Sequence, residues 1–348
     1  MAERSVPSTM RAWQYSSTKG GLEKNLELNA SAALPKPKQN QHLVQIIATA
    51  LNPVDYKPAE IPGVGRFAIT KPATPGIDFV GTIVKPASAS SLKAGQLVFG
   101  CAGNSPLAGG AMAEYAVSSQ NSTAAIPDSL DPLDATTLGV AAVTAYQSIV
   151  PHVKEGGKVF INGGSGGTGI FGIQIAKAAG CHVTTTCSTV NVDLCKSLGA
   201  DNVIDYKEEN VLEVLKAADG MFDHAVDNVG TQDDLIWHCH EYLLPKGLYV
   251  VVGAEPSLKN LAQNVKRKAW PGFLGGIKRN VTGFWPQFNT EDLKKIADWV
   301  AEGKVKPIVD QKFSFDQGPQ AIERLKTGRA KGKIVIEVSS NVNREPTV

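Results

Sequence analysis

The sequence is poor in the features that mark zinc sites, disulfide frameworks and membrane proteins. Its five cysteines are scattered over 348 residues and form no C-x-x-C pair, so we expect neither a zinc knuckle nor a thiol–disulfide redox pair. No run of about 18 apolar residues could span a bilayer, and the first residues contain no apolar stretch typical of a secretory signal. These absences fit a reducing compartment, and we expect a cytoplasmic protein without a membrane span.

A large excess of either charge is also absent, because 35 basic and 33 acidic residues give a net charge of +2. Such a balance gives no reason to expect nucleic acid as a partner. The hydrophobic fraction of 43% is ordinary for a globular protein. A chain of this length is expected to fold as about two domains, each with a core of its own.

The order of predicted elements changes near residue 130. Residues 1–130 form short predicted strands separated by turns with proline and glycine. From residue 131, where a helix is predicted over 131–150, helices alternate with strands, which is typical of the doubly wound parallel sheet of the Rossmann fold. We therefore predict an α/β protein with a Rossmann dinucleotide-binding domain at 131–307. A discontinuous β-rich domain at 1–130 and 308–348 would complete it.

A glycine-rich turn at 162–169, Asn-Gly-Gly-Ser-Gly-Gly-Thr-Gly, joins a predicted strand to a predicted helix. Gly164, Gly166 and Gly169 match G-x-G-x-x-G, whose glycines permit the tight turn, the approach of a pyrophosphate and close helix packing. The free N–H groups at the helix start favour an anion there. A loop without a ligand is the alternative, but the flanking elements favour a dinucleotide. In this turn we expect the cofactor to contact Gly164, Ser165, Gly166, Gly167 and Thr168.

The end of the second strand of this domain decides between NAD and NADP. NAD-binding proteins usually carry Asp or Glu about 20 residues after the turn, where it holds the ribose. Here the segment 187–191 is Cys-Ser-Thr-Val-Asn and contains no acid that would repel a 2′-phosphate. Ser188 and Asn191 can form hydrogen bonds with a phosphate, although Ser188 also suits a helix cap. Tyr206 on the next strand adds a hydroxyl, so the sequence favours NADPH.

Segments in both predicted domains resemble those of one family. INGGSGGTGIFGIQIAKAAG at 161–180 and CSTVNVDLCKSLGADNVIDY at 187–206 lie in the nucleotide domain, while LNPVDYK at 51–57, PGIDFVGTIV at 75–84 and GRAKGKIVIEV at 328–338 lie in the other. Together they are similar to the medium-chain dehydrogenase/reductase superfamily, in its zinc-free quinone oxidoreductase-like branch. This branch includes chloroplast-envelope-type quinone oxidoreductases, reticulon-interacting mitochondrial reductases and fungal enoyl reductase-like proteins. The resemblance implies that the β-rich domain is a GroES-like catalytic domain.

The chain departs from the zinc-dependent members of this superfamily at the positions of the metal ligands. Those members carry a GHExxG segment, whereas residues 76–81 here are Gly-Ile-Asp-Phe-Val-Gly, with isoleucine in place of the histidine. No cysteine precedes Gly100, and Cys101 is the only one near the expected place of the structural zinc lobe. Without such ligands no Lewis acid would acidify an alcohol, so we expect no metal.

The resemblance implies hydride transfer from NADPH to a small electrophilic molecule, either an activated C=C bond (enone, alkenal or enoyl) or a quinone. A hydrogen-bond donor near the carbonyl oxygen would stabilise the charge that collects there. By resemblance, Asn52 lies near the nicotinamide and Tyr56 can donate to the substrate oxygen, although a tyrosine packed in its loop is the alternative. Asp55 and Lys57 are expected only to pair with their surroundings. Further cofactor contacts that the resemblance implies are Asn228, Gly253, Ala254 and Lys333.

Several alternatives stay open at this point. One alternative to a reductase of small free electrophiles is a trans-acting enoyl reductase that serves a biosynthetic synthase. Another is a non-catalytic protein that binds or senses NADPH. Residues 256–290 are basic and aromatic and contain no acid, which fits a lid, a homodimer edge or a solvated loop. His238 and His240 flank Cys239, but helix residues two apart point in different directions, so a structural role is expected.

Overall fold

The chain divides into two compact units, which we describe separately. The residues that the computed structural model describes are 6–61, 63–103, 107, 109–253 and 276–339. The first unit comprises 1–140, 288–301 and 308–348, and the second comprises 141–287 and 302–307. The second unit therefore begins at residue 141, whereas the nucleotide domain is predicted to begin at 131. Residues 288–301, expected in that domain, belong to the first unit.

The first unit contains a six-stranded sheet in the order β13-β14-β3-β4-β5-β6. Within it β3 to β6 are antiparallel, and an additional pairing of β3 with β6 closes these four strands into a ring. The closed ring leaves few unpaired strand edges. The sheet strands are β3 (Gln41–Leu51), β4 (Asp78–Lys85), β5 (Leu97–Ala102), β6 (Tyr115–Ala125), β13 (Val309–Ser314) and β14 (Lys333–Glu337). A separate antiparallel pair consists of β1 (Thr9–Gln14) and β2 (Glu27–Ala33).

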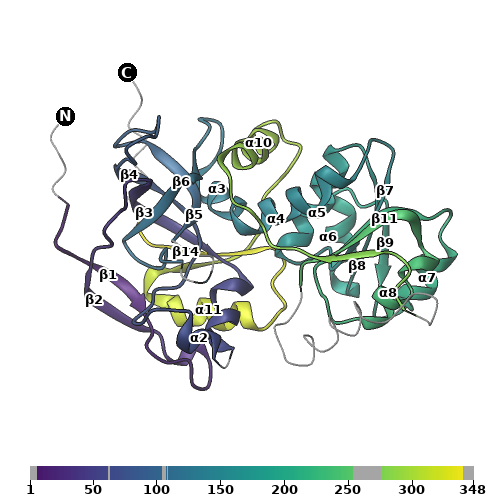
Figure 1. Cartoon of the computed structure of the whole chain (residues 1–348), viewed down its shortest axis with the longest axis horizontal. Helices are drawn as coiled ribbons and strands as arrows, with labels where there is room; N and C mark the ends of the chain where they lie inside the picture. Colours follow the sequence, from purple (N-terminus) through teal and green to yellow (C-terminus); the bar gives the residue numbers. More distant parts are fainter. Residues whose placement is uncertain (1–5, 62, 104–106, 108, 254–275, 340–348) are drawn as a thin grey trace. The chain divides into compact units, whose positions relative to one another are not determined.

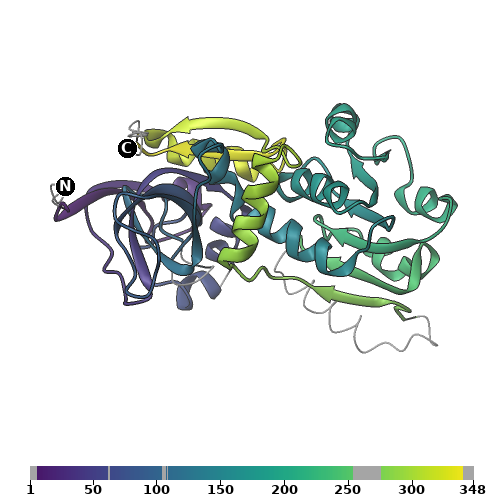
Figure 2. The same ribbon diagram turned by 90° about the horizontal axis from the view of Figure 1, so that it is seen from above.

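Two longer helices pack on this unit. The first, α10 (Thr290–Ala301), is amphipathic and lies next to β6 in Figure 1, where Thr290 Oγ1 donates to the carbonyls of Gln120 (3.1 Å) and Thr123 (3.2 Å). The second, α11 (Gly318–Lys326), lies with β13 and β14, drawn in yellow in Figure 2. Shorter helices fill the connections: η1 (Leu22–Lys24), η2 (Pro53–Asp55), α1 (Lys57–Glu60), α2 (Val64–Phe67), α3 (Pro132–Ala135), η3 (Thr136–Leu138) and η8 (Phe315–Gln317).

The second unit is built on a parallel sheet in the order β9-β8-β7-β10-β11-β12. This is the Rossmann strand order. The sequence order of the strands runs outward in one direction from β7 and in the other from β10, and such sheets bind their ligands at this point, beyond the carboxyl ends of the parallel strands. The strands are β7 (Lys158–Asn162), β8 (His182–Cys187), β9 (Asn202–Asp205), β10 (Phe222–Asp227), β11 (Leu243–Val251) and β12 (Asn280–Gly283). The helices are α4 (Val140–Ile149), η4 (Val150–His152), α5 (Gly167–Ala178), η5 (Thr189–Asn191), α6 (Val192–Ser197), α7 (Val211–Ala217), α8 (Asp233–Trp237) and η6 (Cys239–Glu241).

The single helix predicted over 131–150 is in fact divided at Gly139 into α3, η3 and α4. The backbone of Gly139 leaves the helical region, with ψ at −102°. A side chain at this position would collide with the carboxylate of Asp78, and the N–H of Val140 donates to Asp78 Oδ1 at 2.6 Å. The helix is broken, therefore, where a buried carboxylate from a distant strand takes a free helix N–H. Local periodicity contains no sign of that partner.

Candidate active site

The glycine turn between β7 and α5 has the shape that a dinucleotide requires. A side chain on Gly164 would collide with Thr185 on β8, and one on Gly169 would collide with the carbonyl of Gly163. Gly166 differs, because a Cβ there would lie 3.7 Å from the Gly163 carbonyl oxygen and meet no other atom of the described chain within 4 Å. The first turn of α5 has neither a side-chain cap nor an acid. Its N–H groups are therefore available to a pyrophosphate.

Three of the predicted cofactor residues meet in one cluster, although they come from two loops. The side-chain amide of Asn191 donates from Nδ2 to Ser165 Oγ (3.1 Å) in the glycine turn and to Ser188 Oγ (3.2 Å) after β8. Its Oδ1 is buried and has no hydrogen-bond partner in the described part of the chain. Tyr206 follows β9, where its N–H donates to the Cys187 carbonyl at 3.1 Å, and its side chain is 46% exposed.

A cation that the sequence analysis missed lies at the same edge of the sheet. Cys187 and Asp205 are paired at the ends of β8 and β9, so the residues after them leave neighbouring strand ends. Lys207 is one of these residues, and its Nζ lies 5.5 Å from the centre of the Tyr206 ring. The only sequence signal for it is its position directly after Tyr206.

Asp227, at the end of β10, organises the loop that follows. Its Oδ1 accepts from Asn162 Nδ2 at 2.8 Å and from the N–H groups of Val229 and Gly230, both at 2.9 Å. Its Oδ2 accepts from the hydroxyl of Tyr249 at 3.0 Å. The carboxylate is fully buried, and these four donors satisfy it. Asp227 was not among the predicted site residues, because a carboxylate that holds backbone N–H groups has no sequence signature.

The loop after β10 holds Asn228 beside Gly253. The N–H of Asn228 donates to the Asn162 carbonyl at 3.1 Å, and its Oδ1 is buried without a partner among the described residues. A side chain on Gly253 would collide with the Asn228 carbonyl. An unsatisfied buried acceptor of this kind is costly unless a ligand donates to it. Cofactor contacts of Asn228 and Gly253 stay predictions, and Ala254 lies outside the described residues.

In the first unit, a buried lysine ammonium is surrounded by oxygen acceptors. Lys333 Nζ donates to the carbonyl of Leu51 at 3.2 Å, to Asp78 Oδ2 at 3.0 Å and to Asn52 Oδ1. The exposed fraction is 2% for Lys333 and zero for Asp78. All three N–H donors of the ammonium are used. The predicted contact of Lys333 with the cofactor stays a prediction, and it would require one of these bonds to break.

We call the buried side chains of Asn52, Asp55, Asp78, Cys101 and Lys333 the core cluster. Further hydrogen bonds within it hold Asn52 and Asp78. Asn52 Nδ2 donates to Asp78 Oδ2 at 2.8 Å and to the Ala50 carbonyl at 3.3 Å. Asp78 Oδ1 accepts the N–H of Val140 and faces the thiol of Cys101 at 4.0 Å. Burial, with the charge of Asp78, raises the pKa of that thiol well above its ordinary value. Asn52 therefore uses both N–H bonds of its amide within the cluster, and its predicted place near the nicotinamide stays a prediction.

Asp55 completes the cluster at the end of η2. Its Oδ2 accepts the N–H of Asn52 at 2.7 Å in a capping box. Its Oδ1 has no hydrogen-bond partner in the described chain, although the residue is only 7% exposed. Burial raises the pKa of Asp55 to about 7; Asp78 adds to the rise, while the N–H groups of Asn52 and Ile77 and the charge of Lys333 oppose it. Burial therefore favours the neutral form of the Asp55 carboxyl more than water does.

Tyr56 follows Asp55, and its ring is fixed by a charged cluster. Lys326 Nζ lies 5.5 Å from the centre of the ring. The same ammonium pairs with Glu23 Oε2 at 2.6 Å and with Glu60 Oε1 at 2.8 Å. The position of the Tyr56 ring therefore agrees with the alternative of a tyrosine packed in its loop. Hydrogen bonding from its hydroxyl to a substrate stays a prediction.

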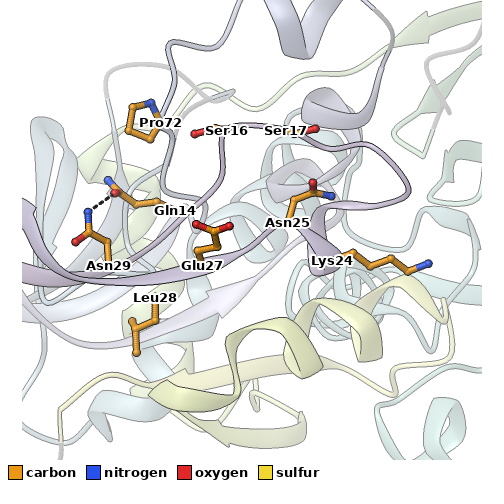
Figure 3. Close-up of a pocket in the computed structure, with 9 residues that line it drawn as sticks. All are labelled: Gln14, Ser16, Ser17, Lys24, Asn25, Glu27, Leu28, Asn29 and Pro72. Carbon is orange, nitrogen blue, oxygen red and sulfur yellow. Dashed lines mark hydrogen bonds between the residues drawn. The ribbon is translucent and has the colours of Figure 1, made fainter.

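A cavity of about 400 Å³ in the first unit is separate from these residues. Gln14 and Asn29, on β1 and β2, are joined across it by a hydrogen bond of 2.9 Å (Figure 3). No member of the candidate site lines it; the lining residues are Gln14, Ser16, Ser17, Lys24, Asn25, Glu27, Leu28, Asn29 and Pro72.

The architecture and its motifs match known proteins. The alcohol dehydrogenase GroES-like domain model matches residues 38–128, and the zinc-binding dehydrogenase model matches residues 198–336. The trans-enoyl reductase pgmF of Aspergillus terreus is 46% identical over 96% of this chain and 97% of its own. The chain belongs to the medium-chain dehydrogenase/reductase superfamily, in its quinone oxidoreductase-like branch.

Other members of the superfamily agree with this placement. The chloroplastic NADPH-dependent alkenal/one oxidoreductase of Arabidopsis thaliana is 33% identical over 96% of this chain and 81% of its own. The solved structure of the quinone oxidoreductase from Coxiella burnetii superposes with a TM-score of 0.82 at 31% identity, over 95% of this chain and 99% of that one. The predicted family, the fold class and the assignment to the reductases are confirmed.

Zinc-binding members of the superfamily raise the question of whether the core cluster fits a metal. Zinc takes thiolate, imidazole or carboxylate ligands. Here Ile77 occupies the histidine position of the family segment. The ammonium of Lys333 already lies between Asn52 and Asp78 and would repel a second cation. These residues do not fit zinc.

Elsewhere in the described residues no group of three or more His, Cys, Asp and Glu has a metal-binding arrangement. His238 Nδ1 lies 2.7 Å from Glu241 Oε1, and the rings of His238 and His240 lie 6.4 Å apart. Within the same residues, no helix has the length and apolar character needed to cross a membrane. Of the segment 256–290, only 276–290 is described; it contributes β12 to the sheet, and Trp285 is half-exposed. Its role as a lid or dimer edge stays a prediction.

Proposed function

We propose that this chain is an NADPH-dependent reductase that transfers hydride to an activated C=C bond or to a quinone. One observation carries the proposal: the glycine turn is joined through Asn191 to a loop with hydroxyl groups and no carboxylate. Relatives named trans-enoyl reductase and NADPH-dependent alkenal/one oxidoreductase support the same chemistry.

The preference for NADPH is supported by the groups around Asn191. Turning its amide over would let the hydroxyls of Ser165 and Ser188 donate to Oδ1. The amide N–H groups would then point to the side that has no partner, where a phosphate can accept them. The hydroxyl of Tyr206 and the ammonium of Lys207 lie at the same strand ends and supply a further donor and a positive charge. A 2′-phosphate would gain from each of these groups, whereas a ribose hydroxyl would gain little.

In this proposal, residues of the chain itself orient the cofactor and activate the acceptor. When bound, the nicotinamide supplies hydride. The Asp227 network fixes Asn228, whose Oδ1 can accept from the carboxamide of the nicotinamide. The hydroxyl of Tyr56 donates to the carbonyl oxygen of the acceptor, where negative charge collects during the transfer. Because the polar groups of the core cluster do not fit zinc, activation depends on such hydrogen bonds, and the acceptor must be electron-poor already.

The test is a panel of acceptors scored by the loss of NADPH absorbance, with NADH measured alongside. We expect turnover with short enones, 2-alkenals or p-quinones, and a clear preference for NADPH over NADH. A Tyr56→Phe variant should lose turnover with the enone, and full retention would remove this hydroxyl from the reaction. If no acceptor consumes NADPH while NADPH binds tightly, the reductase proposal fails and a sensing role replaces it.

A second candidate is a trans-acting enoyl reductase that reduces acyl chains bound to the carrier of a synthase. The 46% identity to pgmF, named a trans-enoyl reductase, favours it. This candidate predicts rapid reduction of 2-enoyl chains on an acyl carrier protein and slow reduction of the same chain as a small free thioester. Equal rates on both would refute it and leave the free electrophile as substrate.

A further inference from the structure

A hollow on the first unit, which we call the α10 hollow, contains one lysine and no carboxylate. It has a volume of about 230 Å³ and lies between the β4–β5 loop, strand β6 and helix α10, all of which belong to the first unit. A threonine and four apolar residues line it together with six polar residues: Ser90, Ser91, Gln120, Asn121, Thr290 and Lys294. The cavity of Figure 3 differs in charge, because it is lined by both Glu27 and Lys24. By charge, the α10 hollow favours an anion.

The chain keeps acidic residues out of the lining of this hollow. Residues 79–113, which include the loop, and 115–127, which include most of β6, contain no Asp or Glu. Thr290 and Lys294 are four residues apart and therefore share one face of α10. The three acids of that helix do not line the hollow, and the last of them is exposed: Glu291, Asp292 and Asp298.

Several hydrogen-bond donors in the α10 hollow are free. The hydroxyl of Ser91, the side-chain amide of Asn121 and the ammonium of Lys294 have no hydrogen bond or ion pair in the described part of the chain. The hydroxyl of Ser90 accepts the N–H of Leu92 at 3.1 Å, and its own O–H is left to donate. These groups come from the loop, from β6 and from α10, so they reach the hollow from three sides.

One amide atom in the lining is also buried without a partner. The Oε1 atom of Gln120 is buried and accepts no hydrogen bond from the described residues. The backbone of Gln120 is fixed, since its N–H donates to the Asn40 carbonyl at 3.0 Å and its carbonyl accepts from Thr290 Oγ1 at 3.1 Å. An unpaired buried polar atom is costly, so a ligand that pairs with this amide is favoured. Turning the amide over presents Nε2 as a further donor.

We propose that the α10 hollow binds a phosphate group, held by the ammonium of Lys294 and by the free donors of Ser90, Ser91, Gln120 and Asn121. The oxygens of a tetrahedral phosphate accept hydrogen bonds from several directions, which suits donors on three sides better than a planar carboxylate does. Free inorganic phosphate and the phosphate of a monoester share this chemistry. The site is separate from the glycine turn, and the inference does not depend on the reductase function.

Isothermal titration calorimetry of the full-length protein with inorganic phosphate, and with glycerol 3-phosphate as a monoester, tests the proposal. Lys294→Gln should weaken the binding of phosphate about 10-fold. The matched control is Lys295→Gln, which removes the same charge from the next residue; Lys295 lies over the Trp299 ring and does not line the hollow. It should bind phosphate as wild type does. Equal losses in both variants, or no binding by wild type at millimolar phosphate, would overturn the proposal.

A second pair of variants reverses the charge in the loop. Ser91→Asp places a carboxylate in the hollow and should abolish binding, whereas Ser88→Asp, exposed on the same loop but outside the lining, should keep it. Retained binding in Ser91→Asp would contradict the site. Each titration is repeated with saturating NADP⁺, and loss of the phosphate signal would place the phosphate at the glycine turn and overturn the proposal. The tighter of the two probes identifies the source of the phosphate group.

Discussion

Replacing Asp55 with asparagine is expected to remove a large pH-dependent contribution to folding stability. The ordinary pKa of an aspartate is 3.8, and burial raises that of Asp55 to about 7 in the folded chain. The folded state therefore binds the proton more tightly than the unfolded state. The stabilisation is fully present below pH about 4 and is lost as the pH rises through about 7. Between pH 5 and pH 8 this loss corresponds to about 2–3 kcal/mol of the free energy of unfolding.

A second buried group, His224, changes the folding stability with pH in the opposite direction. In wild type it offsets most of the change caused by Asp55. It is fully buried, its Nε2 lies 2.6 Å from the Ser148 carbonyl, and burial lowers its pKa from 6.5 to about 4. The stability that it contributes is present above pH about 6.5 and is lost as the pH falls. From pH 5 to pH 8 it adds about 2 kcal/mol, which nearly cancels the loss at Asp55. Wild type should therefore show a small net change in stability.

The assay is urea denaturation of wild type, Asp55→Asn and the exposed control Asp298→Asn at pH 5 and at pH 8. The free energy of unfolding of Asp55→Asn should rise between the two pH values by about 2–3 kcal/mol relative to wild type. The control should follow wild type. If all three proteins respond equally to pH, Asp55 has the same protonation state throughout, and the reasoning on the core cluster is refuted.

Three further predictions concern the cofactor turn, its specificity and the buried ion pair. Gly166→Val should abolish NADPH binding, as measured by fluorescence titration, with the thermal midpoint nearly unchanged because a Cβ has room there; Gly164→Val should instead unfold at a lower temperature. Lys207→Gln should raise KM for NADPH about 2- to 5-fold and leave KM for NADH unchanged, and equal effects on both would contradict the phosphate contact. Lys333→Met should cost about 3–5 kcal/mol in urea denaturation, partly recovered by adding Asp78→Asn; a neutral single variant would refute the pairing.

The glycine turn and the elements on either side of it were predictable because their signals are local. The glycine spacing, the strand before it and the helix after it occupy adjacent positions. A side chain at Gly164 or Gly169 would collide with neighbouring atoms, whereas Gly166 leaves open space. The absence of an acid after β8 is likewise a local property of the sequence. The parallel order of the strands then brings Ser165, Ser188 and Asn191 together, as the general rule for such sheets leads one to expect. Lys207 was missed because no residue pattern distinguishes it from an ordinary surface lysine.

The core cluster was not predictable in the same way, because its members are far apart in sequence. Lys333 is 281 positions from Asn52 and 255 from Asp78, and only the pairing of β14 with β3 and of β3 with β4 brings them together. Family motifs singled out Asn52 and Lys333 one at a time, as separate cofactor contacts. They did not indicate that the two side chains bond to each other, and Asp55 was assigned no role.

The core cluster also narrows the chemistry that the first unit can support. A metal ion that lies near a carboxylate can keep an open position for substrate, and there it acts as a Lewis acid. An ammonium in contact with the same carboxylate balances the charge, but each of its three donors is already used by Leu51, Asn52 or Asp78. It cannot polarise a substrate unless one of these bonds breaks. Stabilisation of the developing charge must then come from hydroxyl or backbone donors, which are weaker than a metal, so an electron-poor acceptor is the substrate that this arrangement suits.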